Sequence, residues 1–312
     1  PTATTSGSEE ITDQAGTYTL SEIDFEGYTE GSWSCSDADG AVAVTNNGAF
    51  GGADVTVALG KDVSCTITNT DDAPSLSVTK TITNDNGGSG TLDDFDVSVD
   101  AVEVAWTTPG STTGGTEVIT DQAGTYTLSE AASDGYTEGT WSCSDADGVV
   151  AVTNNGAFGG ADVTVALGKD VACDITNDDI SPILTLVKEV DNEFGGSAIA
   201  EFWELSADGP TPISDTGYVT SDVDVGTYTL SESYIGPGSD ASYMAEGWSC
   251  VGGDQDGDEI SLDLADDVTC TIVNRFVEAT PVPSSSTWAL ILLTLMLLVT
   301  GWYFKPATMR RF

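Results

Sequence analysis

The chain has 312 residues, of which 51 are acidic and 8 are basic, and it contains no histidine, so its formal net charge is -43. This charge excludes nucleic acid as a natural partner, because phosphate binding needs clustered lysine and arginine side chains. The lack of histidine excludes Ser-His and Cys-His triads and every histidine-ligated metal site. The sequence also has no P-loop, no dinucleotide-binding glycine motif and no G-x-S-x-G elbow, so we expect neither an enzyme nor an organic cofactor.

Three copies of one pattern fill most of the chain. Residues 11–69 match residues 119–177 without a gap and differ at eight of the 59 positions. A third, diverged copy carries GTYTLSE at 226–232, GWSC at 247–250 and VTCTIVN at 268–274. Short alternating apolar runs between Gly, Asn and Asp clusters predict strands. Each copy has about the size of one β-sandwich, so the predicted fold class is all-β, with tandem Ig-like sandwiches and one C-terminal hydrophobic helix.

The alignment of the copies sets the predicted boundaries. Residue 1 corresponds to residue 109, so the first copy lacks the strand that residues 75–84 give the second, and we expect a fragment of a longer exported protein. The predicted domains are an incomplete sandwich at 1–73, a complete one at 74–180, a diverged one at 181–275, a linker at 276–287, a transmembrane or sorting helix at 288–304 and a basic cytoplasmic tail at 305–312.

The six cysteines fall two to a copy. Paired spacing in an acidic exported chain indicates disulfides, and buried free thiols are the alternative. The predicted pairs are Cys35–Cys65, Cys143–Cys173 and Cys250–Cys270.

Acidic turns in each copy are weak candidates for calcium. The motif SDADG occurs at 36–40 and at 144–148, and DQDGDE occurs at 254–259. Alternating aspartates can ligate Ca²⁺ through oxygen, but none of these turns follows the full EF-hand pattern, so solvated turns are the default. The candidate ligands are Asp37, Asp39, Asp145, Asp147, Asp254, Asp256 and Asp258.

A lysine lies on an apolar strand face near the start of the second copy. The segment at 75–84 reads SLSVTKTITN, and Lys80 shares the face of its alternating apolar residues. Glu130, in GTYTLSE, and Asn177, in VACDITN, likewise continue the apolar faces of predicted strands. The counterparts in the third copy are Lys188, Glu232 and Asn274.

These three residue types can react when they are buried together. Burial lowers the pKa of a lysine and raises that of a carboxyl, so the pair can settle in its neutral form. A neutral amine is a nucleophile, a carboxamide is its electrophile, and the protonated acid can shuttle protons as ammonia leaves. The predicted product is an autocatalytic Lys–Asn isopeptide bond. The alternatives are a non-covalent ion pair, or strand ends at the solvent edge with a snorkelling lysine.

The segments LSVTK, GTYTLSE, GYTEGTWSC and VACDITNDD resemble the prealbumin-like, Cna B-type or SpaA-like domains of bacterial surface proteins and pilins. The resemblance covers about residues 1–275 and fits a subfamily that adds two cysteines. It implies an isopeptide in each complete copy, whereas the first copy keeps Glu22 and Asn69 but has no matching lysine. The implied bonds are Lys80–Asn177, assisted by Glu130, and Lys188–Asn274, assisted by Glu232.

The C-terminal segment differs from the copies. Residues 288–304 read WALILLTLMLLVTGWYF, 17 residues without a charge, and cations follow. As a helix this run spans about 25 Å, slightly short of a hydrocarbon core, and the cations predict a cytoplasmic C-terminus. The tail resembles an IPTL-CTERM sorting signal, which implies processing by an exosortase-type membrane protease at a Gram-negative envelope. An ordinary single-pass anchor is the alternative. The residues that carry the resemblance are Val282, Pro283, Trp288, Arg310 and Arg311.

Together these features predict a non-enzymatic bacterial cell-surface protein that forms a stalk. Near-identical copies suit spacing or avidity better than a unique active site. The membrane is its expected partner through the C-terminal helix, and the surface or matrix ligand is left open. The alternative function is a calcium-dependent adhesin that binds glycan or a host ligand through its acidic loops.

Overall fold

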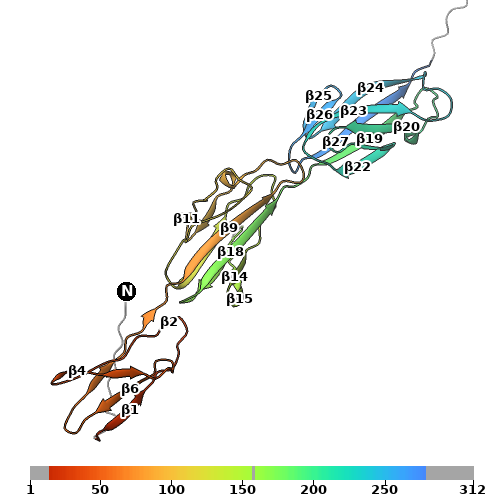
Figure 1. Ribbon diagram of the computed structural model, residues 1–312. Coiled ribbons are helices and arrows are strands. Elements are labelled where there is room, and N and C mark those ends of the chain that lie inside the picture. Colours follow the sequence, from red (N-terminus) through yellow and green to blue (C-terminus); the bar gives the residue numbers. More distant parts are fainter. Residues whose placement is uncertain (1–13, 157–158, 279–312) are drawn as a thin grey trace, which may run out of the picture. The chain divides into compact units, whose positions relative to one another are not determined.

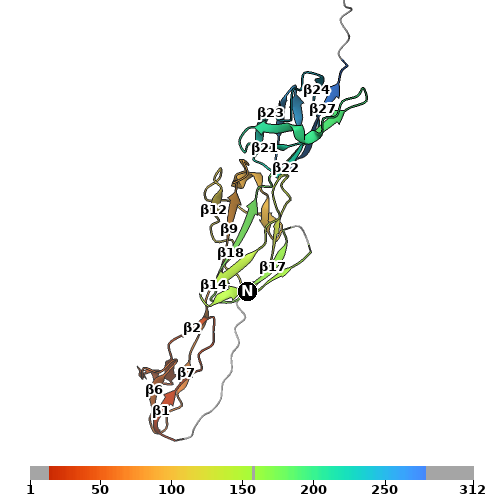
Figure 2. The same cartoon turned by 90° about the vertical axis from the view of Figure 1, so that its right-hand side faces the viewer.

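A computed structural model describes residues 14–156 and 159–278, and Figures 1 and 2 show its ribbon from two sides. Within these ranges the regular structure consists of strands, apart from two short 3-10 helices, η1 (Leu92–Asp94) and η2 (Ala200–Phe202). The prediction of an all-β fold is therefore confirmed.

We call residues 1–73, 74–180 and 181–275 the first, second and third modules, after the copies in the sequence. By its internal contacts the chain separates into two compact units. The first unit, residues 1–182 with 263–265, holds the first and second modules, and the second unit, residues 183–262 with 266–312, holds most of the third.

The described part of the first module forms two three-stranded sheets, in the orders β1-β6-β5 and β4-β3-β7, and a ribbon of β2 and β8. Cys35 and Cys65 lie directly opposite each other in the β3–β7 pair. The strands are β1 (Gly16–Leu20), β2 (Tyr28–Thr29), β3 (Ser34–Asp37), β4 (Gly40–Val42), β5 (Val44–Asn46), β6 (Ala53–Val57), β7 (Ser64–Thr66) and β8 (Thr70–Asp71).

The second module has two five-stranded sheets, in the orders β12-β9-β18-β14-β15 and β11-β10-β13-β17-β16. The strands are β9 (Ser75–Thr83), β10 (Val97–Val99), β11 (Val102–Glu103), β12 (Thr113–Gly115), β13 (Gly124–Glu130), β14 (Ser142–Asp145), β15 (Gly148–Val150), β16 (Val152–Asn154), β17 (Ala161–Val165) and β18 (Asp170–Asp178).

The third module has a four-stranded sheet, in the order β22-β19-β27-β24, and a five-stranded sheet, in the order β21-β20-β23-β26-β25. The strands are β19 (Ile183–Asp191), β20 (Trp203–Asp208), β21 (Ile213–Thr216), β22 (Tyr218–Asp222), β23 (Gly226–Tyr234), β24 (Tyr243–Val251), β25 (Asp254–Asp256), β26 (Glu259–Leu262) and β27 (Asp267–Phe276).

The first and last strands of the second module pair in parallel. β9 and β18 lie side by side in both views (Figures 1 and 2), in a register that runs from Ser75 opposite Asp170 to Thr83 opposite Asp178. β19 and β27 repeat this parallel pairing in the third module. Parallel neighbours need a long crossover, and here the intervening strands form the rest of the sandwich.

The second and third modules each close over an apolar core. In the second module the buried cluster includes Leu76 and Ile175 from one sheet and Leu128 and Val163 from the other, and the third module has an equivalent cluster. Burial alternates along the whole of β9 and β18, as the period of two requires. Lys80 belongs to the buried set of β9 and exposes none of its surface.

Several predicted features fall beyond the part of the chain that the structure describes. They are the hydrophobic segment at 288–304, the basic tail at 305–312 and most of the linker. Among the described residues no helix is both long and apolar enough to cross a bilayer.

Candidate functional site

A closed ring of hydrogen bonds joins a lysine, a glutamate and an asparagine in the second module. Lys80 Nζ donates to Glu130 Oε1 at 2.5 Å and also to Asn177 Oδ1. Asn177 Nδ2 donates to Glu130 Oε2 at 2.9 Å and to the backbone oxygen of Thr137 at 2.8 Å. All three side chains are buried, so the geometry brings the predicted amine, acid and carboxamide together.

Strand periodicity explains why these residues meet. Lys80 is the sixth residue of β9, Glu130 ends β13 and Asn177 is the last but one of β18. Each follows buried apolar residues at spacings of two, so all three side chains point into the space between the sheets. The solvent-edge alternative does not hold for Lys80, which is fully buried.

The third module repeats the constellation with one difference. Lys188 Nζ donates to Glu232 Oε2 at 2.7 Å, and Asn274 Nδ2 donates to Glu232 Oε1 at 2.9 Å. However, Asn274 Oδ1 is buried and has no hydrogen-bond partner among the described residues. The carbonyl that would have to be attacked is therefore engaged by the lysine in the second module but not in the third.

Burial shifts the pKa of both lysines. Loss of solvent lowers the pKa of Lys80 and of Lys188, and the hydrogen bond and negative charge of the neighbouring glutamate act against this shift. Aromatic rings also face the amines: Lys80 Nζ lies 4.5 Å from the ring centroid of Phe95, and Lys188 Nζ lies 4.9 Å from that of Trp203. Such rings favour a cation in a space that offers no water.

Phe95 and Trp203 were not among the predicted site residues. Phe95 directly follows the helix η1, and Trp203 opens β20 directly after η2. The period-two argument does not place residues at such junctions. The only available signal was an aromatic residue about 15 positions after each lysine, at Phe95 and at Trp203.

Gly159, in the loop at 153–160, lies against the acid of the second module. Trp141 Nε1 donates to the oxygen of Gly159 at 2.7 Å, which ties this loop to the strand of Cys143. A Cβ on Gly159 would lie 2.7 Å from Glu130 Cβ, and the φ of this glycine is +54°. Only glycine fits here, because it has no Cβ and readily adopts a positive φ, so Gly159 lets the loop lie against Glu130. Phe158, in the same loop, lies outside the described residues.

The first module keeps two of the three groups. Asn69 Nδ2 donates to Glu22 Oε2 at 3.1 Å, and Asn69 Oδ1 accepts from the backbone nitrogen of Gly31 at 3.1 Å. Glu22 Oε1 is buried and has no hydrogen-bond partner among the described residues. This is the oxygen that corresponds to the lysine-bound oxygen of Glu130.

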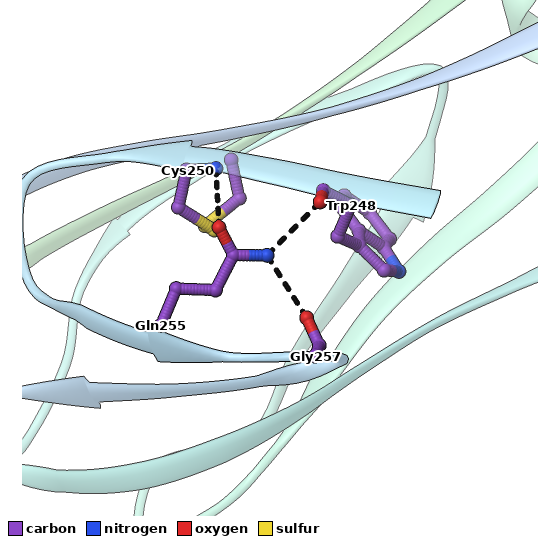
Figure 3. The surroundings of a disulfide bond; sticks show 5 residues. Trp248, Cys250, Gln255 and Gly257 are labelled. Carbon is purple, nitrogen blue, oxygen red and sulfur yellow. Dashed lines mark hydrogen bonds between the residues drawn. A yellow bond between two sulfur atoms is a disulfide. The ribbon is translucent and has the colours of Figure 1, made fainter. Parts of the chain in front are cut away.

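All three predicted disulfides are present, and none of the six cysteines is a free thiol. Each joins directly opposed residues of antiparallel strands: β3 and β7 in the first module, β14 and β18 in the second, and β24 and β27 in the third. In the third module Gln255 holds the neighbouring hairpin to this pair (Figure 3). Its amide nitrogen donates to the oxygens of Trp248 and Gly257, and its oxygen accepts from the nitrogen of Cys250.

The acidic turns at 36–40 and 144–148 contain internal hydrogen bonds. Asp37 accepts from the backbone nitrogen of Asp39 and Asp145 from that of Asp147, and lysines pair with both turns, Lys61 with the first and Lys169 with the second. Over the described ranges, carboxylates converge in a group of three only at Asp85, Asp178 and Asp179, none of which was a predicted calcium ligand. Asp179 accepts backbone N–H groups from Asp85, Asn86 and Gly88, which accounts for its burial.

A family model described as a prealbumin-like fold domain, SpaA_2, matches residues 1–67, 71–175 and 179–272. The chain belongs to this family. The three matches fall one on each module, which confirms the prealbumin-like resemblance of the sequence motifs.

Several solved structures are similar to the chain, and no curated protein matches it. The Bacillus anthracis TIE protein shares 13% identity over 84% of this chain, with a TM-score of 0.40, and the chain covers 52% of that protein. The major pilin T3.2 of Streptococcus pyogenes shares 18% identity over 66% of this chain and 99% of its own, with a TM-score of 0.31. The pilus adhesin SpaC of Lactobacillus rhamnosus GG shares 13% identity over 84% of this chain and 44% of its own, with a TM-score of 0.32.

Proposed function

We propose that the protein is a non-enzymatic structural component of a bacterial surface, a stalk whose modules are locked by internal Lys–Asn isopeptide bonds. The observation that carries the proposal is the buried contact of Lys80 with both Glu130 and Asn177. A charged lysine without exposure is costly in a core, and formation of an amide removes the charge permanently. Membership of the prealbumin-like family supports the same role.

The proposed reaction needs no outside reagent. Glu130 takes a proton from the Lys80 ammonium, and the neutral Nζ attacks Cγ of Asn177. A bond forms between Nζ and Cγ, the bond from Cγ to Nδ2 breaks, and Nδ2 leaves as ammonia with a proton carried by Glu130. The contacts that hold the three groups supply the effective molarity. Nζ gives up two protons in turn: Glu130 passes one to Nδ2 and keeps the other, so an ammonium, a carboxylate and a carboxamide become a secondary amide, a carboxylic acid and ammonia.

The disulfides support an extracytoplasmic location, since disulfides persist in oxidising compartments. We further propose that the segment at 288–304 anchors or sorts the chain at the envelope, with the repeats outside. This part of the proposal rests on its uncharged sequence and on the cations that follow it. We also propose that an exosortase-type membrane protease processes this segment and that the envelope is that of a Gram-negative bacterium.

Intact mass of the unfolded, oxidised 312-residue chain tests the chemistry. We expect a mass lower than the calculated one by two ammonias, one each for the second and third modules. Lys80→Met and Lys188→Met should each restore the mass of one ammonia beyond the substitution itself. A wild-type chain of unshifted mass, with no cross-linked peptide after digestion, would exclude the isopeptide.

A further inference from the structure

The carboxamide oxygen of Asn177 needs a hydrogen-bond donor during the proposed reaction. When the lysine Nζ attacks Cγ, the oxygen Oδ1 gains negative charge, and donors held in place for such an oxygen lower the barrier. Before the attack Oδ1 accepts from Lys80 Nζ, but this nitrogen then becomes the atom that is bonded to Cγ. The donor that takes its place has to come from another group.

Glu130 faces the two nitrogens of the reaction rather than the oxygen. Its Oε1 accepts from Lys80 Nζ at 2.5 Å, and its Oε2 accepts from Asn177 Nδ2 at 2.9 Å. This arrangement suits the transfer of a proton from the amine to the leaving group. It leaves the charge on Oδ1 to a different part of the module.

The near-copy in the first module shows which group can reach this oxygen. The amide nitrogen of Asn69 donates to the glutamate of its module, as that of Asn177 does. Its Oδ1 accepts from the backbone nitrogen of Gly31 at 3.1 Å. Gly31 ends the segment GYTEG, and the same five residues occur again at 135–139. The counterpart of Gly31 in the second module is therefore Gly139.

The backbone of Gly139 lies against the same oxygen in the second module. A Cβ built on Gly139 would lie 2.9 Å from Asn177 Oδ1 and would overlap the side chain of Ile175. Any other residue at this position would push the segment away from the carboxamide, whereas glycine lets the backbone approach closely. The sequence thus keeps a backbone N–H beside the oxygen that develops charge.

The third module has no glycine at this position. Two residues before the WSC motif, where the second module has Gly139, the third has Glu246, whose side chain pairs with Arg275 at 2.9 Å. Asn274 Oδ1 is buried there and has no hydrogen-bond partner among the described residues. Over the described ranges, the carboxamide oxygen therefore has a backbone donor in the first module, a lysine donor in the second and neither in the third.

We propose that the backbone N–H of Gly139 is the oxyanion donor of the reaction between Lys80 and Asn177. As Nζ bonds to Cγ, the electron pair of the C=O bond moves to Oδ1, which then accepts from Gly139 as Asn69 Oδ1 accepts from Gly31. The pair returns when the Cγ–Nδ2 bond breaks and ammonia leaves, and the new amide keeps the hydrogen bond. This kinetic role rests on the proposed isopeptide chemistry, but the hydrogen bond does not.

The ester variant Gly139→glycolate tests the donor, because it replaces the N–H by an oxygen and adds no side chain. The full 312-residue chain is made by cell-free translation under oxidising conditions, and timed digestion with mass spectrometry follows the cross-link of Lys80 with Asn177. We expect its rate to fall about a hundredfold, the loss typical of one oxyanion donor.

Gly148→glycolate is the matched control. The N–H of Gly148 also donates to a side-chain oxygen, Asp145 Oδ1, at 3.1 Å, and this residue lies in a turn of the same module. Its ester should leave the rate of cross-linking unchanged. An equal fall for both esters, or no fall for Gly139→glycolate, would overturn the proposal.

Amide hydrogen exchange, followed by NMR, separates this inference from the proposed function. In Lys80→Met, which cannot cross-link, the N–H of Gly139 should exchange at least tenfold more slowly than in Lys80→Met/Asn177→Ala. The N–H of Gly31 in the same chain is the reference for a bonded donor. Equal exchange of Gly139 in both variants would overturn the donor. Slow exchange in Lys80→Met, with no cross-link in the wild-type chain, would refute only the isopeptide chemistry.

Discussion

At the scale of single residues, the lysine of each complete module is subject to two opposing effects. Loss of solvent disfavours its charged form, and the neighbouring glutamate favours it. Lys80 has no exposed surface and meets one carboxylate, one carboxamide oxygen and one aromatic face. A buried ion pair of this kind is a weak source of stability, because desolvation offsets the attraction. In the proposed function its value lies in reactivity, since the same desolvation that lowers the pKa of the amine would increase its nucleophilic fraction.

In a variant that cannot form the isopeptide bond, these effects should make the free energy of unfolding depend on pH. In Asn177→Ala the amine stays free, and its folded pKa lies below the ordinary 10.5. Below the folded-state pKa, Lys80 is protonated in both the folded and the unfolded state, and the folded state bears the full cost of burying the charge. Between the two pKa values only the unfolded state holds it, so the free energy of unfolding should rise with pH up to about 10.5.

Pulse proteolysis in urea at a series of pH values measures this slope for the second module. The double variant Lys80→Met/Asn177→Ala lacks the titrating amine and serves as the control. The rise should be absent there. An equal rise in both variants would show that another group causes it.

Gly159 offers a second residue-scale prediction with a built-in comparison. Gly159→Ala adds a Cβ at 2.7 Å from Glu130 Cβ at a φ of +54°, whereas Gly156→Ala adds one in open space at a φ of +79°. Both should lose about 1–2 kcal/mol from the left-handed backbone. Only Gly159→Ala should lose a further 1–3 kcal/mol from overpacking and slow the cross-link of the second module. Urea unfolding and peptide mapping measure the two effects, and equal losses would argue against the contact.

At the scale of elements, alternation made the site largely predictable. Because side chains of a strand change face at every residue, the pattern of β9 alone places Lys80 inside, and the same holds for Glu130 and Asn177. The alternation does not say which strands are neighbours, so the parallel pairing of β9 with β18 came from the structure. Phe95 and Gly159 lie at irregular junctions, where side chains do not alternate between two faces, so alternation could not predict them.

Near its candidate site the third module has a strand irregularity. β24 shifts register between Ala245 and Trp248, close to the place where it pairs with Asn274. In the second module the oxygen of Thr137 accepts a hydrogen bond from the amide nitrogen of Asn177, whereas the amide nitrogen of Asn274 donates to Glu232. A bulge of this kind re-aims neighbouring side chains, which explains why the two sites differ although their strands correspond.

At the scale of the whole molecule, the modules should therefore mature in order. We expect Lys80–Asn177 to form before Lys188–Asn274 when the unfolded, uncross-linked chain first refolds, because only Asn177 has its carbonyl engaged by the amine. Timed digestion of newly synthesised protein, with mass spectrometry of both cross-linked peptides, follows the two bonds together. Simultaneous formation, or an earlier bond in the third module, would contradict the role assigned to the register shift.

The parallel pairing of β9 with β18 fixes how a tensile load would pass through the second module. The chain enters at Ser75 and leaves after Asp178, at opposite ends of the paired strands. A covalent link between Lys80 and Asn177, which are 97 positions apart, would carry the load directly from the first strand to the last. The segment between the two linked residues could otherwise extend by about 300 Å at 3.3 Å per residue, but with the link in place it would bear no load. The module would then behave as a short inextensible rod rather than as a spring.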